Sequence, residues 1–289
     1  MTTTARSGTP AATLRPLAPE DLPAAQRLSA RMRWPHRLED WAFLSRLGEG
    51  LAAERDGRLV GTAMGWRLGA GFARIGMVLA EPPGYDAALA RLLMQALVAR
   101  LERPGILLNA TPAGLPLYTS LGFTPTGVVR QYQGASFSIG LVPLPPGHRL
   151  RPIGRRDHPA LAALDAAATG LPRPALVGAL LDGAKGVALD RAGEVAGFAL
   201  LRRFGQGQVI GPVVAPDEAT AKALIGHWLG VQQGQFVRLD VPAESGLPAW
   251  LEALGLDDAG IVTGMALGDA PRPAADAPRC YALASQSLG

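Results

Sequence analysis

The stretch "IGMVLAEPPGYDAALARLLMQAL", residues 75–97, decides how the rest of the chain is interpreted. An apolar run leads into a Pro-Pro-Gly turn and then into leucines at helical spacing, which predicts a strand, a loop and a helix over about 86–102. The first amides of a helix lack partners and its dipole favours an anion, so this layout is that of a phosphate-binding turn. The positions where such turns carry glycine hold Tyr85, Ala88 and Ala90.

The chain repeats itself. "LRPLAPEDLPAAQRLSA" from Leu14 matches "LRPIGRRDHPALAALDA" from Leu150, an offset of 150 − 14 = 136. The offset is 210 − 75 = 135 for "IGMVLA" against "IGPVVA", and 239 − 108 = 131 for "LNA" against "LDV". The interval in which the offset falls from 135 to 131 contains the turn and helix of the opening stretch, so the second copy has lost about one helical turn where the first keeps its full-length loop.

The repeat sets the predicted domain organisation. The turn residues "VPLPPGHR" read as a linker, because Pro-Pro-Gly continues neither a helix nor a central strand. We expect an α/β fold (α+β) of two tandem domains, at 13–142 and 149–268, each a mixed, mostly antiparallel twisted sheet flanked by helices. Residues 269–289 should form a loop and then a strand in "CYALAS".

The first copy has a readable order of elements. It is strand 13–17, helix 20–32, helix 39–47, strands at "GLAAER", "RLVGTAMGW" and "ARIGMVLA", helix 86–102, strand "GILLNA", a short helix around "GLPLYTSLGF" and two more strands to about 142. In the helix, leucines 89, 92, 93, 97 and 101 are expected on one buried face. "RRFGQGQVIG" in the second copy reads as a hairpin turn and not as a nucleotide loop.

Composition argues against several function classes. The net charge of +4 comes without a cluster of five like charges, so nucleic-acid binding has little support despite the high pI. One cysteine and four scattered histidines give no zinc spacing, and no metal is expected. The N-terminus lacks an apolar signal segment and no 18-residue apolar run occurs, so we expect a cytoplasmic protein without a membrane span. No G-x-S-x-G or Walker loop is present.

The order of elements, with the opening stretch followed by "LLNATPAGLPLYTSLGF", resembles the GNAT (GCN5-related N-acetyltransferase) superfamily. The duplication resembles its tandem-domain members, and the resemblance covers residues from about 13 to 268. It implies an acyltransferase that moves an acetyl group from acetyl-CoA to a primary amine of a small molecule or peptide. The identity of this amine and the oligomeric state are not predicted, since a fold does not transfer a substrate.

The resemblance implies a cofactor site in the first copy. In the family, the turn after the fourth strand reads Arg/Gln-x-x-Gly-x-Gly/Ala, and its amides hold the pyrophosphate of acetyl-CoA. Alanine is small enough for this turn, but glycine's freedom at positive φ is lost and Asp86 brings a charge that opposes a phosphate. The sequence therefore leaves two alternatives open: the turn still binds acetyl-CoA, or it is a vestigial site. The positions are Tyr85, Asp86, Ala87, Ala88, Leu89 and Ala90, with an amide among Met77, Val78 and Leu79 expected on the thioester carbonyl.

The same resemblance singles out candidate catalytic residues. Tyr118 stands where many relatives place the phenol that protonates the departing thiolate, and a tyrosine with an ordinary pKa near 10 is protonated at neutral pH. The alternative is a Tyr that only packs and bonds locally. Asn109 is expected on the pantetheine amides or as a cap of the following turn. Glu81, just past the fourth strand, is a candidate base for the amine proton.

The segment "RWPHRLEDW" lies where relatives cover the acceptor pocket. Its tryptophans could wall a pocket for an apolar or cationic group, and its ionisable residues could accept a proton. Helix capping and core packing explain the same residues. The candidates are Trp34, His36, Glu39, Asp40 and Trp41.

The first copy is expected to carry out the chemistry. The second copy runs from strand to helix without room for the loop, so it should bind no CoA and should shape or stabilise the first. The competing hypothesis is a non-catalytic acyl-CoA-binding or interaction protein that keeps the GNAT fold. A weaker third, a basic nucleic-acid-binding module, would lose its ligand steeply with salt.

Overall fold

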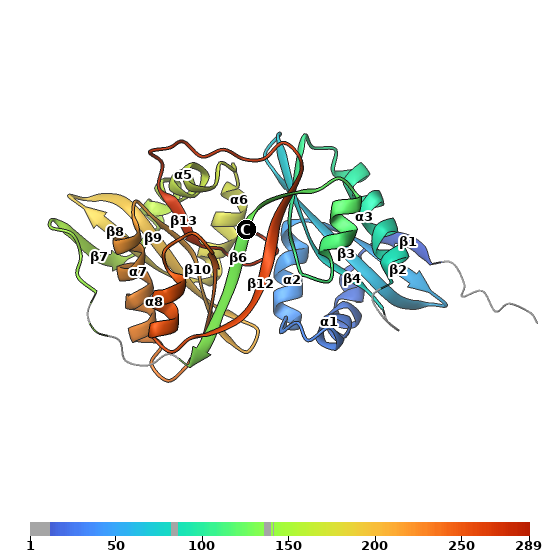
Figure 1. Cartoon of the computed structure of the whole chain (residues 1–289), viewed down its shortest axis with the longest axis horizontal. Coiled ribbons are helices and arrows are strands. Elements are labelled where there is room, and N and C mark those ends of the chain that lie inside the picture. The colour runs from blue at the N-terminus through green and yellow to red at the C-terminus, as the bar shows by residue number, and fades with distance from the viewer. Residues whose placement is uncertain (1–11, 82–85, 136–139, 141) are drawn as a thin grey trace, which may run out of the picture. The chain divides into compact units, whose positions relative to one another are not determined.

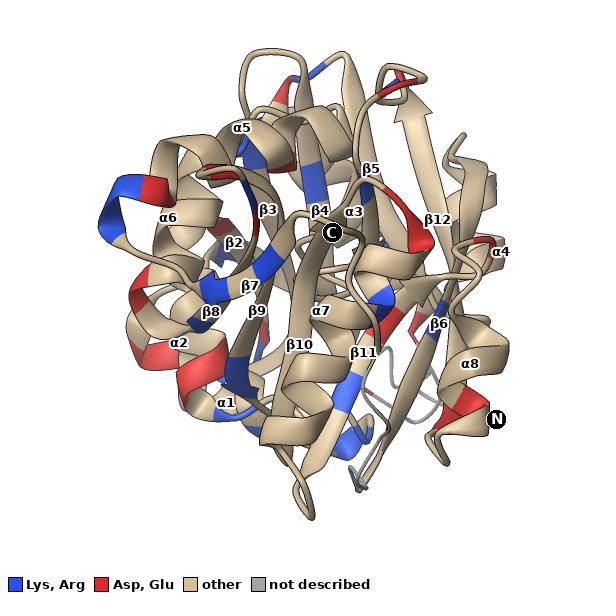
Figure 2. Cartoon of the chain, turned by 90° about the vertical axis from the view of Figure 1, so that its left-hand side faces the viewer, with Lys and Arg blue, Asp and Glu red and all other residues tan. Residues whose placement is uncertain are grey.

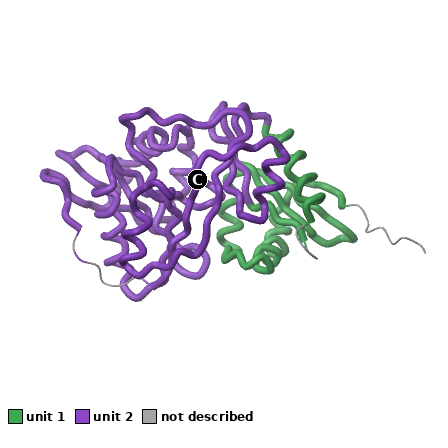
Figure 3. Tube along the Cα trace, in the orientation of Figure 1, with its two compact units in different colours: residues 1–65, 77–101 green, residues 66–76, 102–289 purple. Residues whose placement is uncertain are grey.

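The computed structural model describes residues 12–81, 86–135, 140 and 142–289. Its elements follow one another in the order shown in Figure 1. The chain divides into two compact units (Figure 3). Unit 1 comprises residues 1–65 and 77–101, and unit 2 comprises residues 66–76 and 102–289.

The described part of unit 1 is an antiparallel sheet with three α-helices and a short 3-10 helix at Pro19–Asp21. Strand β1 pairs with β2, for example Thr13 with Glu54, and β2 pairs with β3, for example Gly50 with Met64. The elements are β1 (Thr13–Pro16), α1 (Leu22–Arg31), α2 (Leu38–Leu47), β2 (Glu49–Arg55), β3 (Arg58–Leu68), β4 (Phe72–Ala80) and α3 (Ala87–Leu101); the end of β3 and the start of β4 belong to unit 2.

Helix α3 packs closely on β3 because two glycines of that strand leave room. A Cβ atom at Gly61 would lie 2.8 Å from the carbonyl oxygen of Leu79 and 3.0 Å from a methyl group of Leu93. At Gly65 it would meet the side chain of Leu101. The predicted leucine face is buried except at Leu92, which is 44% exposed, so its expected burial is wrong.

The repeated Arg-Pro motif is a structural clamp. The guanidinium of Arg15 donates to Asp21 at 2.6 and 2.8 Å and to Glu54 at 2.8 Å. Asp21 also accepts the amide of Ala18 at 2.8 Å. One arginine thus joins β1 to β2 and to the turn that starts α1.

The second copy builds the same clamp 136 residues later. Arg151 donates to Asp157 at 2.8 and 2.9 Å and to Asp190 at 2.8 Å, and Asp157 accepts the amide of Gly154 at 2.7 Å. The hydrogen bonds from Arg151 lower the pKa of Asp157 to about 2, although partial burial acts in the opposite direction. The recurrence of Arg and Asp at these positions of the sequence therefore has a structural reason.

The clamp makes stability depend on pH. The folded pKa of Asp157 lies below its unfolded value, so its stabilisation is complete above about pH 4 and is lost as the pH falls towards 2. We expect Asp157→Asn to lower the melting temperature at pH 6, and we expect this gap to the unchanged protein to narrow as the pH falls towards 2, where the folded-state carboxyl group is becoming protonated. Melting curves from pH 2 to 6 measure this. The exposed Asp182→Asn is the control, and a constant gap across the range would contradict the expectation.

Unit 2 holds the remaining elements, with strand order β5-β12-β6-β11-β10-β9-β8-β7. The strands are β5 (Gly105–Ala110), β6 (Thr124–Ala135), β7 (His148–Pro152), β8 (Lys185–Arg191), β9 (Glu194–Phe204), β10 (Gly207–Ala215), β11 (Phe236–Pro242), β12 (Asp257–Gly268) and β13 (Arg279–Ala282). The helices are α4 (Leu115–Ser120), α5 (His158–Thr169), α6 (Pro174–Gly183), α7 (Glu218–Val231) and α8 (Pro248–Ala253).

The two repeats exchange their last strands. Strand β12 of the second repeat lies between β5 and β6 of the first, for example with Met265 opposite Leu108. Strand β6 lies between β12 and β11, and its Tyr132 is fully buried in the core that β8–β11 and α7 form. The predicted ranges 13–142 and 149–268 therefore describe the sequence repeats, whereas the compact units divide the chain differently.

Strand β13 fills a gap in the second repeat. Strands β10 and β11 pair in parallel at Gln208 and Val209. Farther along β10, β13 pairs antiparallel to it, with Val213 opposite Ala282, and the amide of Leu283 donates to Asp240 of β11 at 2.8 Å. The strand predicted in "CYALAS" is present as β13, Arg279–Ala282, so it includes only the first three residues of that stretch, and it occupies the space where the two parallel strands separate.

The shortening of the second copy lies in a loop. Helices α3 and α7 have 15 and 14 residues. Residues 81–86 join β4 to α3, whereas only 216–217 join β10 to α7, a difference of 6 − 2 = 4 residues. The offset therefore falls by four because the loop is shorter and not because the helix is.

Candidate active site

Strand β4 carries an irregularity in unit 1, at the first of the three positions expected near a thioester. Met77 has φ of 52°, a left-handed conformation that is rare for a residue other than glycine. The fully buried Thr62 donates its hydroxyl to the carbonyl oxygen of Met77 at 2.8 Å and so supports this backbone. A residue in this conformation turns neighbouring peptide groups out of the regular ladder, as in a bulge. Val78 and Leu79 follow it and are buried.

The second repeat has no amide at the matching position. The offset of 135 places Pro212 where the first repeat has Met77, and proline has no N–H to donate. The pairing of β10 with β9 also shifts register here, between Ile210 and Val213. A Cβ atom at Gly211 would lie only 2.0 Å from the carbonyl oxygen of Leu283, so the chain itself approaches this point.

The start of α3 is capped by its own carboxylate. Oδ1 of Asp86 accepts the amide of Leu89 at 2.9 Å, and the carbonyl oxygen of Asp86 accepts the amide of Ala90 at 2.9 Å. Ala87 and Ala88 are exposed. Tyr85 lies outside the described residues. The cap confirms that Asp86 places negative charge at the helix start, where a pyrophosphate was expected.

A cation lies beside this cap. The Arg55 guanidinium is 3.7 Å from Oδ2 of Asp86, in the same compact unit. Such a cation offsets part of the carboxylate charge, and it can pair with a phosphate group instead. The start of α3 therefore combines two exposed alanines, one arginine that can attract a phosphate and one carboxylate that opposes it.

Glu81 is engaged in ion pairs. Its Oε1 accepts from Arg31 at 2.5 Å and from Arg58 at 3.1 Å, and its amide donates to Val60 at 2.7 Å. These contacts tie the end of β4 to α1 and β3. Proton acceptance by Glu81 would weaken both ion pairs, so its role as a base stays a prediction.

Two of the predicted acceptor-pocket residues hold helices together. Asp40 accepts the amide of Arg37 at 2.9 Å and pairs with its guanidinium at 2.8 Å, which caps α2. The fully buried Trp41 donates from its indole to the hydroxyl of Ser29 on α1 at 3.1 Å. These contacts agree with the alternative of capping and core packing.

The other three pocket candidates are less buried. Glu39 is exposed on α2, and Trp34 and His36 are half-buried with ring centroids 5.9 Å apart. The two rings form a tilted pair, which leaves part of each accessible. Trp34, His36 and Glu39 remain the better candidates for contact with an acceptor.

Tyr118 and Asn109 belong to unit 2. Tyr118 on α4 is 7% exposed, and its ring packs edge-on against Phe123 with centroids 6.1 Å apart. Gly114 is needed beside it, because a Cβ atom there would lie 2.8 Å from the tyrosine ring. Asn109 donates to the carbonyl oxygen of Gln286 at 2.7 Å, a partner that no local pattern indicated. The following turn is capped by Thr111 instead, whose hydroxyl accepts the amide of Gly114 at 3.3 Å.

Other kinds of site find no support in the described residues. Within them, no three His, Cys, Asp or Glu residues gather as metal ligands would. No helix among the described segments is long and apolar enough to cross a membrane. Figure 2 shows Lys and Arg positions interspersed with Asp and Glu positions on the elements in view.

Comparisons with known proteins agree with this fold. A model of the GNAT acetyltransferase domain matches residues 161–282. The uncharacterized N-acetyltransferase YitH of Bacillus subtilis is 29% identical over 225 residues, which cover 74% of this chain and 76% of the relative. The family model thus matches the second repeat, which was expected to be degenerate, and that degeneracy stays a prediction.

Solved structures share the fold over most of the chain. A candidate acetyltransferase from Pyrococcus horikoshii superposes with a TM-score of 0.79 at 17% identity, covering 100% of this chain and 99% of the other. A tandem GNAT protein from the clavulanic acid biosynthesis pathway gives 0.65 at 14% identity, covering 91% and 99%. The second repeat therefore matches the GNAT acetyltransferase domain in sequence, and the whole chain has the fold of a tandem GNAT protein.

Proposed function

We propose that the first repeat transfers an acetyl group from acetyl-CoA to a primary amine of a small molecule or peptide. The observation that carries this proposal is the left-handed Met77 in β4, fixed by the buried Thr62 hydroxyl. Backbone strain of this kind costs free energy and is concentrated at functional sites. A backbone amide in this irregular part of β4 is the proposed donor that polarises the thioester carbonyl.

The reaction follows from the groups present. The amine nitrogen attacks the carbonyl carbon, the C–N bond forms and the C–S bond breaks. The amine proton passes to a base, for which Glu81 is the candidate, and the leaving thiolate takes a proton from the phenol of Tyr118. Met77 and Tyr118 belong to different compact units, so the family resemblance is what assigns them to one reaction.

The start of α3 is the proposed position for the pyrophosphate. The backbone amides of Ala87 and Ala88 and the guanidinium of Arg55 suit an anion, whereas the carboxylate of Asp86 opposes it. When bound, acetyl-CoA supplies the activated acetyl group. The chain's part is to bind its diphosphate, orient its carbonyl and provide the proton for its thiol.

Asp86→Asn is expected to tighten acetyl-CoA binding. Asparagine also caps a helix, so the bond to the Leu89 amide can be kept while the charge next to the diphosphate is removed. A single charge at a helix start changes the binding free energy of an anion by about 0.3–1 kcal/mol. Removing the charge of Asp86 should therefore lower the Kd for acetyl-CoA roughly twofold to fivefold. Calorimetric titration measures it, with Asp56→Asn as a control on an exposed turn. An unchanged or higher Kd would place the diphosphate elsewhere.

The test of the function itself is thiol release with a panel of primary amines. A transferase releases CoA in proportion to amide formed, and the wild-type chain should also bind acetyl-CoA in the titration. The second candidate, a non-catalytic acyl-CoA-binding protein, is favoured by the Asp86 cap, which already uses one helix amide. It predicts binding without thiol release for every amine. Absence of binding contradicts both.

A further inference from the structure

The C-terminal segment, residues 279–289, joins parts of both repeats within unit 2. Its strand β13 fills the gap between β10 and β11, and the chain then turns through residues 284–289. The turn is held at both ends, because Arg202 donates to the carbonyl oxygen of Ala284 and Arg173 donates to those of Leu288 and Gly289, each at 2.8 Å. The middle of the turn is therefore presented in a fixed position.

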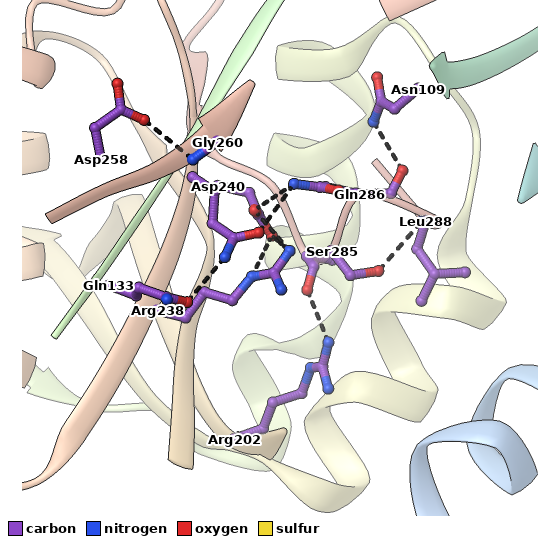
Figure 4. A network of polar contacts seen from close by, with 12 residues as sticks. Asn109, Gln133, Arg202, Arg238, Asp240, Asp258, Gly260, Ser285, Gln286 and Leu288 are labelled. Atoms are coloured by element: carbon purple, nitrogen blue, oxygen red, sulfur yellow. Dashed lines mark hydrogen bonds and ion pairs between the residues drawn. The ribbon is translucent and has the colours of Figure 1, made fainter. Parts of the chain in front are cut away.

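Gln286 lies at the middle of this turn and is anchored to the second repeat. Its side-chain amide donates to Asp240 at 3.0 Å (Figure 4). It also donates to Gln131 at 3.3 Å. Asp240 is fully buried and also accepts from Arg238 at 2.9 and 3.0 Å. A buried carboxylate held by a neighbouring guanidinium is a rigid acceptor, so the position of Gln286 follows that of β11.

The backbone of the same residue holds the first repeat. The carbonyl oxygen of Gln286 accepts from Nδ2 of Asn109 at 2.7 Å, the shortest of the contacts made by this residue (Figure 4). An asparagine amide has two donors and an acceptor oxygen, so this bond fixes the plane of the group and leaves other positions for a ligand. The segment thereby orients the residue that resemblance assigns to pantetheine.

The contact lies where two strands of the first repeat separate. Parallel pairing of β4 with β5 reaches Arg74 opposite Leu107. Asn109 is two residues past that pair on β5, and Gly76 is two residues past it on β4. At Gly76 a Cβ atom would lie 3.1 Å from Cβ of Ser287, and Arg74 donates to the carbonyl oxygen of Ser287 at 3.4 Å. Adjacent residues of the segment thus touch both strands.

We propose that Gln286 is a positioning residue for acetyl-CoA binding, which acts by fixing the side-chain amide of Asn109. The inference rests on the proposed function of the first repeat. The inference gives the second repeat a role that needs no cofactor of its own. The gap between β10 and β11 is filled by β13. The buried Arg238–Asp240 pair then sets the position of Asn109 through Gln286.

Gln286→Met tests this inference. Methionine keeps the volume and removes the amide that bonds to Asp240 and Gln131, so the turn loses its anchor while the carbonyl oxygen remains. Loss of one such anchor corresponds to roughly a threefold to tenfold higher Kd and KM for acetyl-CoA, with kcat changed by less than about twofold. Gln131→Met leaves the bond to Asp240 in place and removes the 3.3 Å contact with Gln286, together with the 2.8 Å hydrogen bond from Gln131 to Gln133, so it should give a smaller rise. Gln233→Met, on an exposed turn, is the matched control.

A double-mutant cycle separates positioning from general stability. If Gln286 acts through Asn109, Gln286→Met adds nothing to the Kd once Asn109→Ala is present. Additive effects, or a lowered melting temperature with unchanged acetyl-CoA affinity, overturn the inference and leave the proposed function intact. Wild-type protein that fails to bind acetyl-CoA overturns the proposed function and this inference with it.

Discussion

Tyr118→Phe is expected to lower kcat by about 10²- to 10⁴-fold, because positioned general acids contribute factors of that size. The thiolate would then leave without a proton from the protein. The KM for acetyl-CoA should change little, since the loss falls on a step after binding. Initial rates of thiol release across a range of pH measure the effect, and the loss should be smallest where solvent can protonate the thiolate.

The fold should tolerate this exchange. Tyr118 is 7% exposed and packs its ring edge-on against Phe123, and phenylalanine keeps that ring in place. Tyr281→Phe is the matched control, because Tyr281 is a comparably buried tyrosine, 4% exposed, on β13. Turnover that is unchanged at every pH would show that Tyr118 only packs, which is the alternative left open by the sequence.

Local patterns predicted the elements well. Strand β5 has the predicted bounds, Gly105–Ala110, and α3 runs from Ala87 to Leu101 where 86–102 was expected. The hairpin turn at Gly205 is also confirmed, since β9 ends at Phe204 and β10 begins at Gly207. These elements depend on periodicity and turn residues that lie within one short window.

Non-local pairing could not be predicted. Two strands were expected after α4, but among the described residues β6 alone follows it before the linker. The missing neighbour of β5 is β12, more than a hundred residues later, and no local signal distinguishes a strand that pairs in its own repeat from one that is exchanged. The same reason explains why Gln286 was missed: its bond to Asn109 spans 177 positions.

The candidate site was predicted in part. The sequence indicated that the charge of Asp86 would oppose a phosphate at the helix start, but it did not indicate that this carboxylate caps the helix by accepting the amide of Leu89. Asp40 and Trp41 could be assigned to a pocket or to capping and packing, and their contacts with Arg37 and Ser29 agree with the latter, while a role in the pocket stays a prediction. The conformation of Met77 had no signal, since its side chain reads as ordinary core.

Arg173→Met is expected to destabilise the protein by about 3–5 kcal/mol, the usual cost of leaving one member of a buried ion pair without its partner. Arg173 and Asp165 have side chains 1% and 0% exposed. Their two hydrogen bonds are 2.6 and 2.9 Å long. Folded proteins of ordinary stability have about 5–15 kcal/mol in total, so this change should remove a large fraction.

The arginine has a second role that adds to the loss. Its Nη1 donates to the carbonyl oxygens of Leu288 and Gly289, so it also holds the C-terminal segment. Burial opposes its charged form, but the charge and hydrogen bonds of Asp165 outweigh this and raise the pKa of Arg173. One effect acts in the opposite direction: burial and the charge of Arg173 lower the pKa of Arg74 to about 10, so removing Arg173 relieves some repulsion.

Urea unfolding of three variants separates these contributions. Arg156→Met, at an exposed position, is the control and should change the free energy of unfolding by less than about 0.5 kcal/mol. Adding Asp165→Leu to Arg173→Met should recover part of the loss, because no unpaired carboxylate is then buried. What stays lost in the double variant is assigned to the segment that Arg173 holds. Equal stability of Arg173→Met and the control would mean that Asp165 finds water or another cation, and that the pair does not anchor residues 288–289.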